Sequence, residues 1–69
     1  MKETLAQIES RPGSPHPFCA GIVLWDDRVV EAAPCVRWMK RWGRKRVREF
    51  CLRGGWTVRV VHELERERP

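Results

Sequence analysis

Apolar residues are concentrated in residues 18–25, where Ile22-Val23-Leu24-Trp25 forms a continuous run. A short apolar run of this kind is typical of a strand that is buried on both faces. Asp26-Asp27 predicts a two-residue turn, after which residues 28–31 return as a second strand. The turn sets three cross-strand pairs, which are Trp25–Arg28, Leu24–Val29 and Val23–Val30. The pattern therefore predicts a β-hairpin whose first strand lies in the middle of a sheet.

The next segment, residues 34–53, has its apolar residues at helical spacing. Pro34 suits the first turn of a helix, and Gly54-Gly55 is a stop signal. Two apolar stripes recur, one formed by Cys35, Trp38, Met39 and Trp42 and the other by Val47, Phe50 and Cys51. A single straight helix would place Arg46 at the centre of the first stripe, and Gly43 weakens a helix by about 1 kcal/mol relative to alanine. We therefore predict two short helices, or one sharply bent helix, with the break near Gly43.

Residues 56–62 alternate as a half-buried strand does. One side carries Trp56, Val58, Val60 and His62, and the other carries Thr57, Arg59 and Val61. The order of elements is then β-β-α-β, an α+β fold. A right-handed crossover places the last strand beside the first and antiparallel to it, which gives a three-stranded, antiparallel-type sheet in the order 2-1-3 with the helices on one face. The other face stays exposed unless the N-terminal segment or a second subunit covers it, so a homodimer is a further expectation.

Both ends of the chain are predicted to be peripheral. Thr4 to Glu9 fits one or two helical turns with Leu5 and Ile8 on one side, too short to be stable alone. Residues 11–17 hold three prolines and a glycine, which is typical of an extended linker. The predicted organisation is a flexible N-terminal segment and Pro-rich linker at 1–17, a single α+β domain at 18–65 and a frayed tail at 66–69.

Length and cysteine content narrow the class of protein. The 69 residues make one small domain, in which about 60% of the unfolded chain's surface can be buried. No apolar run approaches the ~20 residues of a membrane span, and residues 1–4 lack the apolar core of a signal peptide. Three cysteines, an odd number, argue against a secreted disulfide framework. We therefore expect a cytoplasmic protein that does not bind membranes. The cations are 11 Arg and only 3 Lys, a usage that follows from GC-rich codons and indicates a bacterial or phage gene, so the expected location is the bacterial cytoplasm.

The net charge of +5 is unevenly distributed. Residues 37–53 hold eight cations and one anion, Glu49, so this segment carries +7 and the rest of the chain −2. Such a segment either contacts an anionic partner or is an ordinary solvated helix face, whose long cations cover apolar surface with their stems.

No residues suggest catalysis or a resident cofactor. Asp26 and Asp27 share a tight turn, where carboxylates are solvated and point apart. Five side chains could supply zinc ligands, namely His16, Cys19, Cys35, Cys51 and His62. The cysteines are 16 residues apart and lack close pairs, and Cys35 and Cys51 lie on apolar stripes that predict core positions. We therefore expect no enzyme, no cofactor and no metal, and we single out Cys19 as the residue that could form an intermolecular disulfide.

Tryptophans and cations supply the candidate binding residues. Trp38 and Trp42 fit the helical stripe and are predicted to be core residues. Trp25 and Trp56 lie at the ends of predicted strands, where they could anchor an interface. The predicted binding residues are Arg37, Lys40, Arg41, Arg44, Lys45, Arg48, Trp25 and Trp56. Tryptophan and arginine together form hot spots in protein interfaces and also stack on unpaired bases, so both kinds of partner stay open.

Four segments carry a resemblance to other proteins. The residues concerned are Gly21-Ile22-Val23-Leu24-Trp25-Asp26, Val29-Val30-Glu31-Ala32-Ala33-Pro34, Arg37-Trp38-Met39 and Gly55-Trp56-Thr57-Val58. Together they resemble small proteins encoded by phages and prophages of GC-rich bacteria, a group that includes many anti-CRISPR proteins. The resemblance implies a non-enzymatic inhibitor that binds a subunit of a CRISPR effector and sterically blocks the binding of target DNA. The positive charge departs from anti-CRISPR proteins that mimic DNA, so an acidic protein surface or the effector's RNA is the expected contact.

An alternative interpretation is a small basic protein that binds nucleic acid. Two helices with a cationic second part resemble the helix-turn-helix of DNA-binding proteins, in which Arg44, Lys45 and Arg48 would reach the DNA. The helical segment lacks Asn and Gln, the residues that read adenine, so its arginines would bind mostly phosphate.

Overall fold

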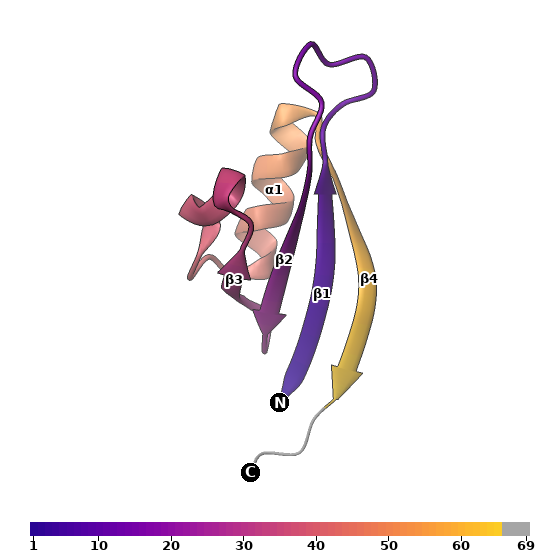
Figure 1. Ribbon diagram of the computed structural model, residues 1–69. Coiled ribbons are helices and arrows are strands. Elements are labelled where there is room, and N and C mark those ends of the chain that lie inside the picture. The colour runs from indigo at the N-terminus through magenta and orange to yellow at the C-terminus, as the bar shows by residue number, and fades with distance from the viewer. Residues whose placement is uncertain (66–69) are drawn as a thin grey trace.

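The computed structural model describes residues 1–65 as an α+β fold, in which a four-stranded antiparallel sheet carries a helical layer on one face (Figure 1). The elements are β1 (Lys2–Glu9), β2 (Cys19–Trp25), β3 (Arg28–Ala32), the 3₁₀ helix η1 (Pro34–Met39), α1 (Arg44–Gly54) and β4 (Thr57–Glu65). The strand order is β3-β2-β1-β4. The α+β prediction is thus confirmed, but the sheet has four strands where three were predicted. The predicted frayed tail at 66–69 lies outside the described residues.

The additional strand is β1, in the segment for which the sequence predicted helical turns. β1 pairs antiparallel with β2 on one side and with β4 on the other, so it lies inside the sheet (Figure 1). Leu5 and Ile8, expected on one side of a helix, point to opposite faces, with Ile8 fully buried and Leu5 38% exposed. The helical prediction for Thr4–Glu9 is therefore wrong, and residues 2–9 belong to the sheet rather than to a peripheral segment.

The β2–β3 hairpin forms largely as predicted. Asp26 and Asp27 have φ angles of 49° and 64°, the left-handed values that a type I′ turn requires at both central positions. Trp25 pairs with Arg28 and Leu24 with Val29, as expected. The third predicted pair is wrong, because a β-bulge shifts the register and places Val23 opposite Glu31.

The predicted break in the helical segment is confirmed. η1 ends at Met39, and α1 begins after Gly43, which has an extended backbone (φ −73°, ψ 155°). α1 ends as predicted, because Gly55 adopts φ 77° and the amide N–H of Trp56 donates to the carbonyl of Cys51 over 2.8 Å.

The first apolar stripe is arranged differently from the prediction because η1 consists of two 3₁₀ turns, with a kink at Val36 (φ −127°, ψ 22°), and not of α-helix. This geometry buries Val36 and Met39, three residues apart, at 1% and 0% exposure. Cys35 is exposed and Trp38 is 46% exposed, so the prediction that both belong to the core is wrong.

β4 forms where a strand was predicted, but with different neighbours. It pairs with β1 and not with the hairpin's first strand, so it runs in the same direction as β2 and antiparallel to β3, opposite to the prediction. A bulge changes its alternation: Val60 lies opposite Ala6, but His62 lies opposite Leu5 on the other face. β4 is also more exposed than a half-buried strand, because Val58 alone among Thr57–Glu65 is partly buried.

The core lies between the sheet and the helical layer. The fully or nearly buried apolar residues are Ala6, Ile8, Ala20, Ile22, Leu24, Val29, Val36, Met39, Val47 and Cys51. The other face keeps exposed apolar side chains, including Leu5, Trp25 and Leu64. Within residues 1–65, no helix is long and apolar enough to cross a membrane.

Candidate functional site

The arginines of α1 fall on two different sides of the helix. Val47 and Cys51, four residues apart, form its buried stripe. Arg44 and Arg48, also four apart, line a hollow together with strand residues. Arg46 and Arg53 line another hollow, together with Trp38 of η1 and with Trp42. The helical repeat of 3.6 residues produces this division, because positions 44 and 48 flank one side of the buried stripe and positions 46 and 53 the other. The arginines of α1 in the predicted basic segment therefore line two surfaces and not one.

The first surface is a cluster of aromatic rings between η1 and α1. Phe50 contacts three tryptophans edge to face, with ring centroids 5.0 Å from Trp38, 5.6 Å from Trp42 and 5.7 Å from Trp56. Phe18 extends the cluster through Trp56, at 4.9 Å. Such edge-to-face pairs stabilise beyond the area they bury. Trp38 and Phe50 nevertheless remain 46% and 41% exposed, so the cluster reaches the protein surface.

Charged side chains from α1 surround the exposed rings. The guanidinium carbon of Arg46 lies 4.0 Å from the ring centroid of Trp42, a cation–π contact. Arg46, Glu49 and Arg53 line a shallow hollow with the rings, and they leave it one net positive charge. We refer to Trp38, Trp42, Arg46, Glu49, Phe50 and Arg53 as the aromatic–arginine patch.

Arg44, by contrast, is held in an ion-pair network. Its Nη1 lies 2.9 Å from Oε1 of Glu63 and 3.2 Å from Oδ1 of Asp27, and Nζ of Lys2 lies 3.0 Å from the same Asp27 oxygen. The network joins the starts of β1 and α1 to the β2–β3 turn and to β4. Hydrogen bonds from Lys2 and Arg44 lower the pKa of Asp27, and the hydrogen bond from Arg44 lowers the pKa of Glu63. Arg44 thus has its charge neutralised within the fold.

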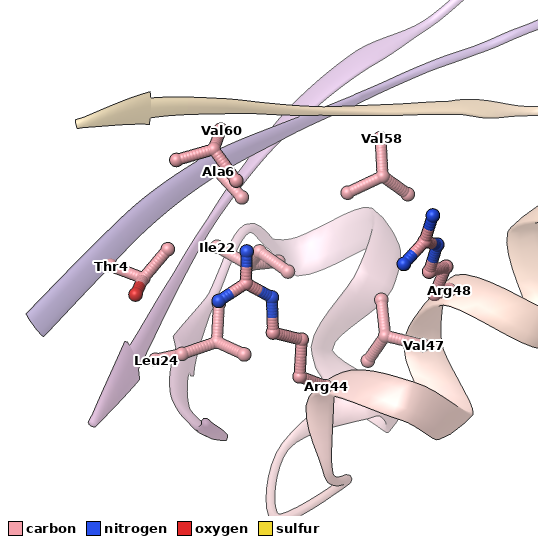
Figure 2. Close-up of a pocket in the computed structure, with 9 residues that line it drawn as sticks. All are labelled: Thr4, Ala6, Ile22, Leu24, Arg44, Val47, Arg48, Val58 and Val60. Carbon is pink, nitrogen blue, oxygen red and sulfur yellow. The ribbon is translucent and has the colours of Figure 1, made fainter. Parts of the chain in front are cut away.

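The second surface is a groove between α1 and β4, shown in Figure 2. One helix is about 10 Å across and strands are about 4.8 Å apart, so a single helix cannot cover four strands. The uncovered part is a cavity of about 270 Å³. Its lining residues are Thr4, Ala6, Ile22, Leu24, Arg44, Val47, Arg48, Val58 and Val60. The guanidinium groups of Arg44 and Arg48 point from α1 toward the strands over this largely apolar floor (Figure 2).

The remaining predicted cations are spread over the surface. Arg37 and Lys40 are exposed on and just after η1. Arg41, with φ 74°, is exposed in the connection to α1, and its carbonyl accepts a hydrogen bond from Nη1 of Arg28 over 2.7 Å. Lys45 is exposed beside Gly43 and contributes to neither surface.

The two tryptophans predicted as anchors occupy different places. Trp25 is 45% exposed on the sheet face away from α1, and its Nε1 donates to Glu3 over 3.3 Å. Trp56 is only partly exposed, packed between Phe18 and Phe50. The structure therefore brings Trp56 to the edge of the aromatic cluster and leaves Trp25 on a separate surface.

The sequence interpretation missed the members of the aromatic–arginine patch as binding residues. Trp38 was predicted to be buried because its spacing from Cys35 and Trp42 is helical, and the 3₁₀ geometry of η1 exposes it instead. Phe50 was assigned to the second buried stripe, yet only Val47 and Cys51 of that stripe are buried. The signal that could have identified the patch is the i, i+4, i+7 spacing of Arg46, Phe50 and Arg53, which places them on one side of α1.

The three cysteines lie on different elements, Cys19 on β2, Cys35 on η1 and Cys51 on α1. Cys19 and Cys35 are exposed and Cys51 is buried, and burial raises the pKa of the Cys51 thiol. Nε2 of Gln7 donates to Sγ of Cys19 over 2.6 Å at the start of β2. In the described part of the chain, no three His, Cys, Asp or Glu side chains are grouped to hold a metal ion.

Comparison with known proteins found no match to this chain among protein families, curated proteins or solved structures.

Proposed function

We propose that this protein is a small non-enzymatic inhibitor that binds an acidic surface of another protein through the aromatic–arginine patch. The observation that carries the proposal is the exposed Trp38–Phe50 pair beside Arg46 and Arg53. Trp and Arg are the residues most enriched in the energetically dominant centres of protein interfaces, and a packed cluster presents them without further ordering.

The arrangement of the rings favours a protein partner over unpaired bases. Bases stack on open ring faces. In the patch the rings pack edge to face with one another, and Arg46 lies over a face of Trp42. The exposed parts of a rigid aromatic cluster fit a pocket on a protein surface, and the surrounding arginines attract carboxylates there.

The inhibitor role rests on the resemblance to small phage-encoded proteins. On this proposal the partner is a subunit of a host CRISPR effector, and a bound domain of 69 residues obstructs the surface that target DNA must reach. No catalytic step is needed, because occupancy alone blocks the DNA. The partner surface is acidic, since the patch has a net positive charge and the exposed Arg37, Lys40 and Arg41 add to the positive charge of the protein.

A second candidate function is sequence-independent nucleic-acid binding. Lys45 and Arg48 are exposed on α1, and no ion pair joins either side chain to a carboxylate within residues 1–65. These residues and Arg44 were the ones expected to reach DNA. Arg44 is already paired with Asp27 and Glu63, which weakens this candidate.

A salt titration separates the two functions. We expect random duplex DNA to bind no more tightly than the ~10⁻⁴–10⁻⁶ M of non-specific contacts, and the charge reversals Arg46→Glu and Lys45→Glu to weaken that binding equally. Sub-micromolar binding that falls steeply with salt and is lost when Arg44, Lys45 and Arg48 are replaced by alanine would support the nucleic-acid function and contradict the inhibitor proposal. Circular dichroism of each variant controls for folding.

A further inference from the structure

The groove between α1 and β4 combines a buried apolar floor with one free positive charge. A space of about 270 Å³ lies above this floor, but Ala6, Ile22 and Leu24 are only 6%, 2% and 2% exposed, so the apolar side chains that a ligand can reach are mainly Val58 and Val60 of β4. The side chains of Arg44 and Arg48 extend from α1 over this space (Figure 2). Val60, on the β4 side, is 42% exposed, so the groove opens toward the free edge of the sheet.

The two arginines at the groove have different electrostatic surroundings. Arg44 is paired with both Asp27 and Glu63. Arg48, one turn further along α1, forms no ion pair with any residue in the range 1–65. A charge-complementary ligand would therefore place its anionic group on Arg48.

The groove offers almost no other polar group to a ligand. The only polar side chain on its floor is Thr4, whose hydroxyl already donates to Oε1 of Glu63 over 3.3 Å. A ligand with polar substituents along its length would bury them without partners, at a cost in affinity. The matching ligand has an unsubstituted apolar body and a single anionic end.

We propose that the groove is a binding site for a linear aliphatic carboxylate, with the alkyl chain along Val58 and Val60 of β4 and the carboxylate on the guanidinium of Arg48. The site is on the opposite side of α1 from the aromatic–arginine patch. It is therefore independent of the proposed inhibitor function, and either can fail without the other.

The site is tested by NMR titration of the whole protein with straight-chain carboxylates from butanoate to decanoate, each below its micellar concentration. The quantity measured is the chemical shift of the valine methyl groups in the groove. We expect saturable shifts at Val47, Val58 and Val60. Each CH₂ added to the alkyl chain should lower Kd roughly fourfold, because burial of one CH₂ contributes about 0.8 kcal/mol. Once the groove is full, a longer chain should lower Kd no further. Octylammonium, with the same chain and the opposite charge, should not bind.

Two variants with the same change of charge complete the test. Arg48→Gln should weaken octanoate binding by about tenfold. Arg59→Gln should leave Kd unchanged, because Arg59 is on β4 but contacts Gln7 and Glu9 on the other sheet face. Absence of saturable binding, equal weakening by both variants, or shifts centred on Val23 of the open face would each overturn the proposal.

Discussion

Arg44 and Arg46 show how two similar residues, two positions apart on one helix, acquire different roles. Arg44 points toward the sheet and lies within 3.2 Å of two carboxylates, so its charge is used within the fold. Arg46 points toward η1 and stacks on Trp42, so its charge remains available to a partner. The sequence selected Arg44 as a binding residue, and it used Arg46 only as an argument for a helix break near Gly43. Neither interpretation could be corrected from the sequence, because the roles of Arg44 and Arg46 depend on where Glu63 and Trp42 lie in three dimensions.

Acid should weaken the ion-pair network around Arg44. The pKa values of Asp27 and Glu63 are lowered in the folded protein, so the unfolded chain binds protons at a pH where the folded protein does not. The two carboxylates therefore contribute to the free energy of unfolding at pH values above their ordinary pKa of about 4. This contribution is lost as the pH falls toward their lower pKa values in the folded protein. The free energy of unfolding, measured by urea denaturation from pH 7 to pH 3, should decrease on the acid side.

Asp27→Asn isolates one member of this network. Asparagine tolerates the left-handed φ of 64° at this turn, so the change removes charge without straining the backbone. The variant should be less stable at pH 7 by no more than about 1 kcal/mol, as for other exposed ion pairs, and should approach the wild type in acid. Glu31→Gln, which changes an exposed carboxylate on β3, is the control. A stability difference that grows in acid would contradict this assignment.

At the scale of elements, β1 is the strand on which the sheet depends. Within residues 1–65, it is the strand that pairs with both β2 and β4. Its backbone hydrogen bonds therefore connect the β2–β3 hairpin to β4. The groove also depends on β1, because Thr4 and Ala6 form part of its floor.

Two alanine substitutions in β1 test its position in the sheet. Ile8→Ala should cost about 2–5 kcal/mol, because Ile8 is fully buried beneath the helical layer, and in so small a domain this can remove the folded state altogether. Leu5→Ala should cost much less, because Leu5 is 38% exposed on the other face. Urea denaturation followed by circular dichroism measures both. Equal losses would indicate that the two side chains share one face, as in the helix first expected for this segment.

The sequence was informative where local chemistry determines structure. Asp26-Asp27 indicated the hairpin turn, Gly43 the break and Gly54-Gly55 the end of α1, and each was found there. β1 was missed because its residues are mostly good helix formers, and pairing with β2 and β4 overrides that propensity. The neighbours of β4 were then wrong as well, since β1 occupies the place beside β2 that had been assigned to the last strand.

The candidate site was predicted less completely than the fold. The sequence located the basic and aromatic segment between Arg37 and Arg53, but it could not divide that segment into two surfaces. That division depends on two structural facts: η1 is a 3₁₀ helix, which exposes Trp38, and the arginines of α1 flank Val47 and Cys51 on both sides. The disulfide through Cys19 and a homodimer that covers the open sheet face stay predictions.

At the scale of the whole molecule, the sheet separates an open face from the face that carries the helical layer. Leu5, Trp25 and Leu64 are exposed on the first, and both candidate binding surfaces lie on the second. Because α1 contributes to the patch on one side and to the groove on the other, one helix could contact two different partners. The +7 segment found in the sequence thus contains one ion-pair centre at Arg44, two candidate binding surfaces, and further exposed cations that belong to neither surface.

The most direct test of the central proposal is an interference assay in bacteria with an active CRISPR effector. The plating efficiency of a targeted phage is measured in cells that express the wild type, Arg46→Glu or Lys45→Glu, two variants with the same change in charge. We expect the wild type and Lys45→Glu to restore plaques and Arg46→Glu to lower plating ~10-fold or more, as loss of an interface hot spot would. No restoration by the wild type, or equal plating with both variants, would contradict inhibition through the aromatic–arginine patch.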